Sequence, residues 1–165
     1  MHTVSPASEP QTLARLRVFL LATLALGMVG TGLELLLLGH GESVQQWIPA
    51  VLLAGGVAII VWHAIAPSAA SVRTLQTVMA LFIAAGVLGV GLHYDGNVEF
   101  QRELTPAMDG MDLMWKALTG ATPVLAPGAM ILLGLVGLAH AYRHPCLPNG
   151  GAAFRLRGDT CIDSR

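Results

Sequence analysis

The chain has 165 residues, of which 54% are hydrophobic and 12% are charged, with a net charge of -1. A soluble domain carries roughly 25% charged residues, so this composition argues against a water-soluble protein and for a single domain embedded in lipid. The chain also lacks the basic, aromatic-interleaved surface that nucleic-acid binding requires.

Four apolar stretches are long enough to cross a hydrocarbon core of roughly 30 Å. They cover residues 18–39, 47–66, 72–93 and 124–142. The first is interrupted only by Thr23, Thr31 and Glu34, and it is too long for the apolar part of a signal peptide. These spans predict an all-α integral membrane fold with four transmembrane helices in an up-down-up-down bundle.

Arginines mark the predicted cytoplasmic side, because short segments rich in Lys and Arg are retained there. They flank the first span, the turn between the second and third, and the end of the fourth: Arg15, Arg17, Arg73, Arg143, Arg155, Arg157 and Arg165. The opposite side is mainly acidic. We therefore expect a multi-pass protein of the cell inner (plasma) membrane with both termini cytoplasmic. Its expected parts are an N-terminal segment (1–17), the transmembrane domain (18–145) and a flexible tail (146–165).

The outer connection, residues 94–123, is too long for a tight turn and is expected to have structure of its own. Thr105 followed by Pro106 predicts the start of a short helix. Apolar side chains then recur at helical spacing: Met108, Met111, Trp115 and Leu118. This pattern predicts an amphipathic helix in the outer membrane interface. An alternative for the three methionines at 108, 111 and 114 is a Cu(I) site built from thioethers.

Cys146 and Cys161 are the only cysteines, and both lie in the C-terminal tail. Thiols on the cytoplasmic side stay reduced, so the sequence predicts no disulfide between them.

The four spans suggest an internal duplication. The first and third share a glycine pattern, with Gly27, Gly30 and Gly32 matching three glycines that begin at Gly86. The second and fourth each carry a proline followed by a histidine near the end of the span. Two readings remain: a pair of duplicated helical hairpins, or chance similarity among glycine-rich apolar helices. The glycines themselves could allow close helix packing or leave room for a flat cofactor.

Histidines form a predicted inner layer. His63 on the second span and His140 on the fourth would face each other across the bundle axis, and His144 follows about one turn later. Two facing neutral imidazoles are what bis-histidine ligation of haem b requires. The alternative is that these are interfacial histidines at the membrane boundary.

A second, outer layer mixes carboxylates with imidazoles and is a candidate site for Zn, Mn or non-haem Fe. Its members are Glu34, His40, His93, Glu99 and Glu103. Glu34 and His93 could instead relay protons or bind a cation in a transporter, or Glu34 could simply make one interhelical hydrogen bond.

The sequence predicts no particular reaction, because no nucleophile with a partnered base is evident. We expect a small polytopic inner-membrane protein that binds haem or a transition metal and serves redox chemistry or metal handling. The alternatives are a proton-coupled transporter or accessory subunit, and a structural membrane protein without a cofactor. The expected partners are the lipid bilayer and either a second copy or another membrane protein.

Overall fold

The computed structural model describes residues 9–39, 44–120, 126–147, 156–157 and 160–161. In chain order the elements are α1 (Glu9–Leu37), α2 (Val44–Ile65), α3 (Ala69–Leu104), α4 (Gly110–Leu118), α5 (Gly128–Ala141), β1 (Leu156–Arg157) and β2 (Thr160–Cys161). The described part of the chain is thus helical, apart from one antiparallel pair of two-residue strands that the sequence did not predict. The rest of the predicted flexible tail, residues 148–155, 158–159 and 162–165, lies outside the described residues.

Three helices are long and apolar enough to cross a membrane: Gln11–Leu37, Gln46–Ile65 and Ala69–Leu104. The fourth predicted span corresponds to α5, which is equally apolar but has only 14 residues. At 1.5 Å per residue α5 is about 21 Å long, less than a hydrocarbon core of roughly 30 Å.

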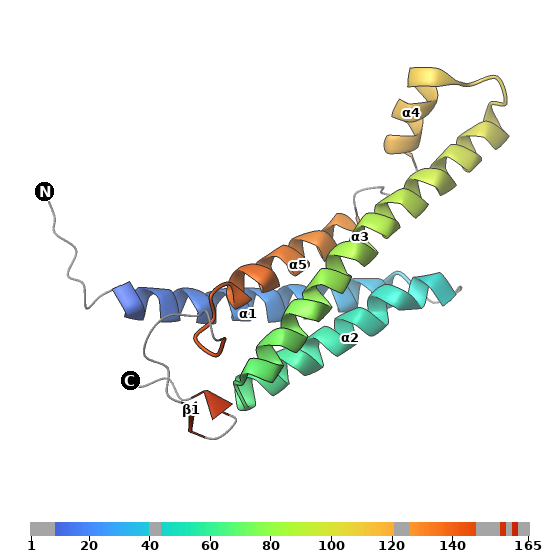
Figure 1. Cartoon of the computed structure of the whole chain (residues 1–165). Helices are drawn as coiled ribbons and strands as arrows, with labels where there is room; N and C mark the ends of the chain where they lie inside the picture. The colour runs from blue at the N-terminus through green and yellow to red at the C-terminus, as the bar shows by residue number, and fades with distance from the viewer. Residues whose placement is uncertain (1–8, 40–43, 121–125, 148–155, 158–159, 162–165) are drawn as a thin grey trace, which may run out of the picture.

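By their contacts the three long helices and α5 form a ring, and Figure 1 shows α3 crossing the group diagonally. α1 contacts α2 and α5, and α3 contacts the same two helices, so α2 and α5 face each other across the ring. The side chains inside it are apolar, with Leu24, Met79 and Phe82 fully buried. The outward faces are apolar too, as Leu26 and Ile65 illustrate with exposed fractions of 76% and 79%. Such a surface is suited to lipid rather than to water.

Glycines let α3 and α5 pack at short range. A Cβ atom added to Gly134 would lie 2.7 Å from the Met79 carbonyl oxygen, and one added to Gly86 would lie 3.0 Å from the Ile131 backbone nitrogen. Neighbouring backbone, rather than a cofactor, therefore occupies the space beside these glycines. No heavy atom lies within 4 Å of the corresponding position on Gly30.

The outer end of the molecule differs from the prediction. α3 runs 36 residues, to Leu104, instead of ending near His93. At about 54 Å it is longer than the hydrocarbon core, because polar residues 94–104 continue the helix without a proline to end it. The predicted helix start at Thr105 was wrong, since Thr105 caps the end of α3 and α4 begins at Gly110.

α4 folds back against the end of α3, as Figure 1 shows. The buried Asn97 side chain on α3 donates a hydrogen bond to the Ala117 carbonyl oxygen at 2.8 Å. Gly120 follows at close range, where a Cβ atom would lie 2.8 Å from the Asn97 amide. This polar contact attaches α4 to the projecting part of α3.

The expectation of reduced cysteines was wrong for Cys146, which is disulfide-bonded in the structure. Cys161 is the only other cysteine in the chain. Cys146 is buried and packs with Val72 and Ala141, so the fold draws this part of the tail against the helices. The redox state of a compartment says nothing about whether a cysteine packs against the helices.

Candidate metal centre

Three buried histidines converge at one end of the helical ring. His63, His140 and His144 are only 4%, 3% and 9% exposed. Each offers one ligand atom, and these atoms all lie within 4.8 Å of one another. In the part of the chain that the structure describes, this is the one group of three or more His, Cys, Asp or Glu residues that could hold a metal ion.

The ends of two facing helices position this group. His63 lies two residues before the end of α2, and His140 is the penultimate residue of α5. After α5, Arg143 adopts a left-handed backbone conformation with φ of 45°. This turn, closed by the His144 amide donating to the Ala141 carbonyl at 3.2 Å, returns His144 to the other two histidines.

Ser71 is the hydrogen-bond partner of His63 Nδ1. The Ser71 hydroxyl lies 2.9 Å from this nitrogen and 3.0 Å from the Ser68 carbonyl oxygen. Because a hydroxyl both donates and accepts, either nitrogen of the neutral His63 ring can carry the proton. The contact orients the ring with Nε2 toward His140.

A backbone carbonyl fixes the proton of His140. Its Nδ1 lies 3.0 Å from the Arg17 carbonyl oxygen in α1, an acceptor that requires an N–H partner. The neutral His140 ring therefore has an unprotonated Nε2, which lies 3.4 Å from His63 Nε2. Two buried imidazole nitrogens at this distance can share either a proton or a cation.

The 3.4 Å separation of these Nε2 atoms matches tetrahedral metal binding. Two nitrogens bound to one tetrahedral ion at bonds of about 2.0–2.1 Å lie roughly 3.3–3.4 Å apart. The Nδ1 hydrogen bonds to Ser71 and to the Arg17 carbonyl are of the kind that orient metal-binding histidines. The two rings are therefore held in an arrangement that could accept a metal ion.

His144 is neutral, and the hydrogen bond to its ring is longer than those to His63 and His140 Nδ1. Burial, followed by the neighbouring His63, His140 and Arg17, lowers the pKa of His144 to about 3. A metal ligand must be deprotonated, and this histidine is so throughout the physiological pH range. Its Nδ1 accepts the Cys146 backbone N–H at 3.3 Å, a long bond that ligation through Nδ1 would replace.

No family model, curated protein or solved structure matches this chain. Its function therefore has to be argued from the chemistry of the site.

The predicted site residues fall into two groups. The structure brings His63 and His140 together, whereas Glu34, Glu99 and Glu103 are exposed and His93 is partly buried. Within the described ranges none of these outer residues joins an ion-holding group, and His40 lies outside those ranges. An outer metal site therefore stays a prediction that the geometry does not favour.

The sequence does not predict His144 as a ligand, although it follows His140 by about one turn. Its spacing of four residues from His140 is the one signal in the sequence, because His at i and i+4 of a helix can bind one ion. In the structure a turn rather than a helix brings the two rings together.

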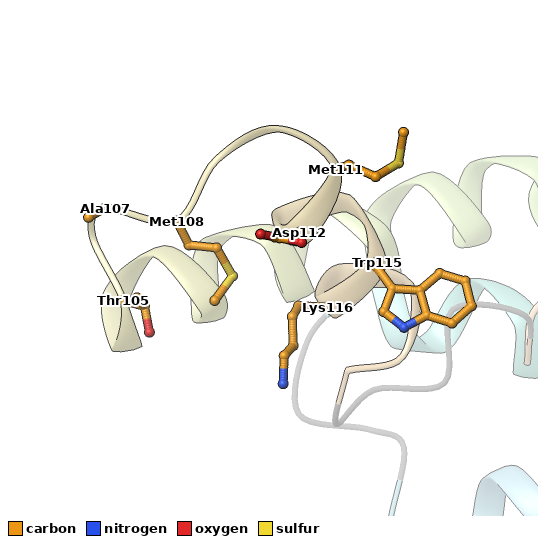
Figure 2. Close-up of a pocket in the computed structure, with 7 residues that line it drawn as sticks. All are labelled: Thr105, Ala107, Met108, Met111, Asp112, Trp115 and Lys116. Atoms are coloured by element: carbon orange, nitrogen blue, oxygen red, sulfur yellow. The ribbon is translucent and has the colours of Figure 1, made fainter.

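A groove of about 540 Å³ lies beside α4. Its lining residues are Thr105, Ala107, Met108, Met111, Asp112, Trp115 and Lys116 (Figure 2). The Met108 and Met111 side chains point in different directions in Figure 2. Trp115 is 65% exposed, as expected for a helix whose apolar face meets lipid headgroups. A Cu(I) site at these methionines stays a prediction.

Proposed function

We propose that this protein is a metal-binding four-helix bundle of the inner membrane, which holds one transition-metal ion between His63, His140 and His144 for metal handling. The observation that carries the proposal is the 3.4 Å contact between the Nε2 atoms of two buried histidines, with His144 beside them.

The donor set favours particular metals. Imidazole nitrogen suits Zn, Cu, Ni and Fe, whereas Mg, Ca and Mn prefer oxygen ligands. No carboxylate belongs to the histidine group among the described residues. Zn²⁺ accepts tetrahedral nitrogen coordination without a redox change, so it is the ion that we expect first.

Haem fits this geometry less well than a single ion does. Axial ligands on opposite sides of one iron lie about 4 Å apart, twice a metal–nitrogen bond of roughly 2 Å. The His63 and His140 Nε2 atoms are closer, at 3.4 Å. His144 also offers a ligand atom, within 4.8 Å of those of the other two histidines. Backbone and side chains fill the space beside Gly86 and Gly134, where a flat ring would need room.

The charge pattern supports a membrane orientation for the bundle. Arg17, Arg143 and Arg73 belong to the same end of the helices as the three histidines. That end is cytoplasmic under the positive-inside rule. α1, α2 and α3 would cross the bilayer fully, and α5 would cross as a short fourth span that locally thins it.

Metal binding by the purified protein tests the proposal. We expect one Zn²⁺ per chain in detergent, with affinity reduced at least about 100-fold in His63→Ala and His140→Ala, as loss of a direct ligand should exceed the effect of losing its supporting hydrogen bond. His93→Ala is the matched control, because this histidine lies outside the group.

Two outcomes would reject this assignment. Zn²⁺ binding that depends on His93 and tolerates His63→Ala would move the site to the outer layer. A reduced-minus-oxidised visible spectrum with sharp haem bands, lost in His140→Ala, would replace the ion by haem.

A further inference from the structure

The histidine group offers a tetrahedral ion only three ligands. Resting on the metal site proposed above, we propose that the ion keeps its fourth position for a small exogenous anion, hydroxide included, which the Arg17 guanidinium attracts. The site would then be of the open type, able to take a ligand from solution.

Three donors are insufficient for a closed tetrahedral centre. The structure adds no fourth His, Cys, Asp or Glu from the described ranges. The groups hydrogen-bonded to the His63 and His140 Nδ1 atoms, the Ser71 hydroxyl and the Arg17 carbonyl oxygen, lie on the ring edge away from the Nε2 atoms that face each other. A structural zinc site closes with four protein ligands, whereas catalytic sites with three histidines leave the fourth place to water or substrate.

Charge favours an anion at that fourth place. Three neutral imidazoles leave both positive charges of a divalent ion uncompensated in a buried site, which is unfavourable without a counter-charge. Arg17 adds a further positive charge close enough to act on His140 and His144. A small anion between the ion and the guanidinium would compensate both.

Arg17 is also held in position. Its guanidinium Nη2 donates a hydrogen bond to the Arg143 carbonyl oxygen at 3.2 Å, in the turn that carries His144. Arg17 therefore contacts two parts of the site: its backbone carbonyl orients His140, and its side chain lies beside the segment of His144. Arg15, two residues earlier on α1, is exposed and shares neither contact.

The test uses the full-length protein loaded with Co²⁺, whose visible absorption reports coordination geometry, and titrated with sodium azide in chloride-free buffer. We expect tetrahedral Co²⁺ bands that azide shifts in a saturable manner. In Arg17→Gln the azide affinity of the Co²⁺-loaded form should fall roughly five- to tenfold, the loss of about one charge–charge contact. Arg15→Gln should behave as the unmodified protein does.

The results separate this inference from the metal site itself. Tetrahedral Co²⁺ bands that do not respond to azide would mean a closed centre and overturn the open position, while leaving the metal site intact. An azide response unchanged in Arg17→Gln would overturn the role of Arg17. Failure of the unmodified protein to bind Co²⁺ would overturn both proposals.

Discussion

Ser71 contributes to two structures through one hydroxyl group. It accepts the Ser68 backbone N–H in the capping box that begins α3, and it is hydrogen-bonded to His63 Nδ1. The first contact stabilises the helix start, and the second orients the His63 ring with Nε2 toward the site. A residue that looks like an ordinary helix cap therefore also positions a histidine of the site.

Replacing Ser71 should separate these two roles. In Ser71→Ala we expect Zn²⁺ affinity to fall about 10- to 100-fold, because His63 loses the partner that orients it. Ser68→Ala is the control, since it removes the other half of the capping box at a stability loss of about 1 kcal/mol without touching His63. Chelator competition measures the affinity of each variant. Equal weakening in both would mean that Ser71 acts only through the helix start.

At the scale of helices, the contact between α3 and α5 determines how closely the histidine-bearing end of α5 is held. Gly134 lies against the Met79 carbonyl oxygen, and backbone cannot move aside as a side chain can. Gly30 on α1 is also helical, yet faces open space. Gly134 therefore allows close packing of two helices, whereas Gly30 makes no such contact.

Alanine at each position should therefore have opposite effects. Gly134→Ala should lower the free energy of unfolding by about 1–3 kcal/mol, the usual effect of overpacking. Gly30→Ala should leave stability unchanged or raise it by roughly 0.5–1 kcal/mol, because alanine favours a helix over glycine. Thermal denaturation in detergent compares them. A stable Gly134→Ala variant would show that α5 can move away from α3, and would weaken the case for a preformed site.

At the scale of the whole molecule, two features indicate different compartments for the C-terminus. Four arginines after α5 favour the cytoplasm, at Arg143, Arg155, Arg157 and Arg165. The disulfide at Cys146 is typical of an oxidising compartment instead. Arg17 near the start of α1 contacts His140 and Arg143 at the end of α5, so one compartment must hold both of these ends and the histidine site.

Fusion reporters decide between these orientations. Because four arginines flank the last helix, we expect a C-terminal green fluorescent protein to fluoresce and a C-terminal alkaline phosphatase to be inactive. Fusions after residue 39 should give the reverse pattern. An active C-terminal phosphatase would mean that the bundle is inserted the other way round, because His140 and Arg143 contact Arg17 at the same end. The histidine site would then lie on the outer side of the membrane.

The sequence by itself determined what depends on composition along the chain: a helical protein with long apolar segments, and paired histidines near the ends of two of them. Hydropathy is a local property that can be summed along the chain, so it identifies apolar segments without knowledge of the fold. Tertiary structure alone decided that His144 joins the pair, because a left-handed turn at Arg143 returns it. It also decided the orientation of the His63 and His140 rings, since this follows from Ser71 and the Arg17 carbonyl, partners that only packing brings within hydrogen-bond distance.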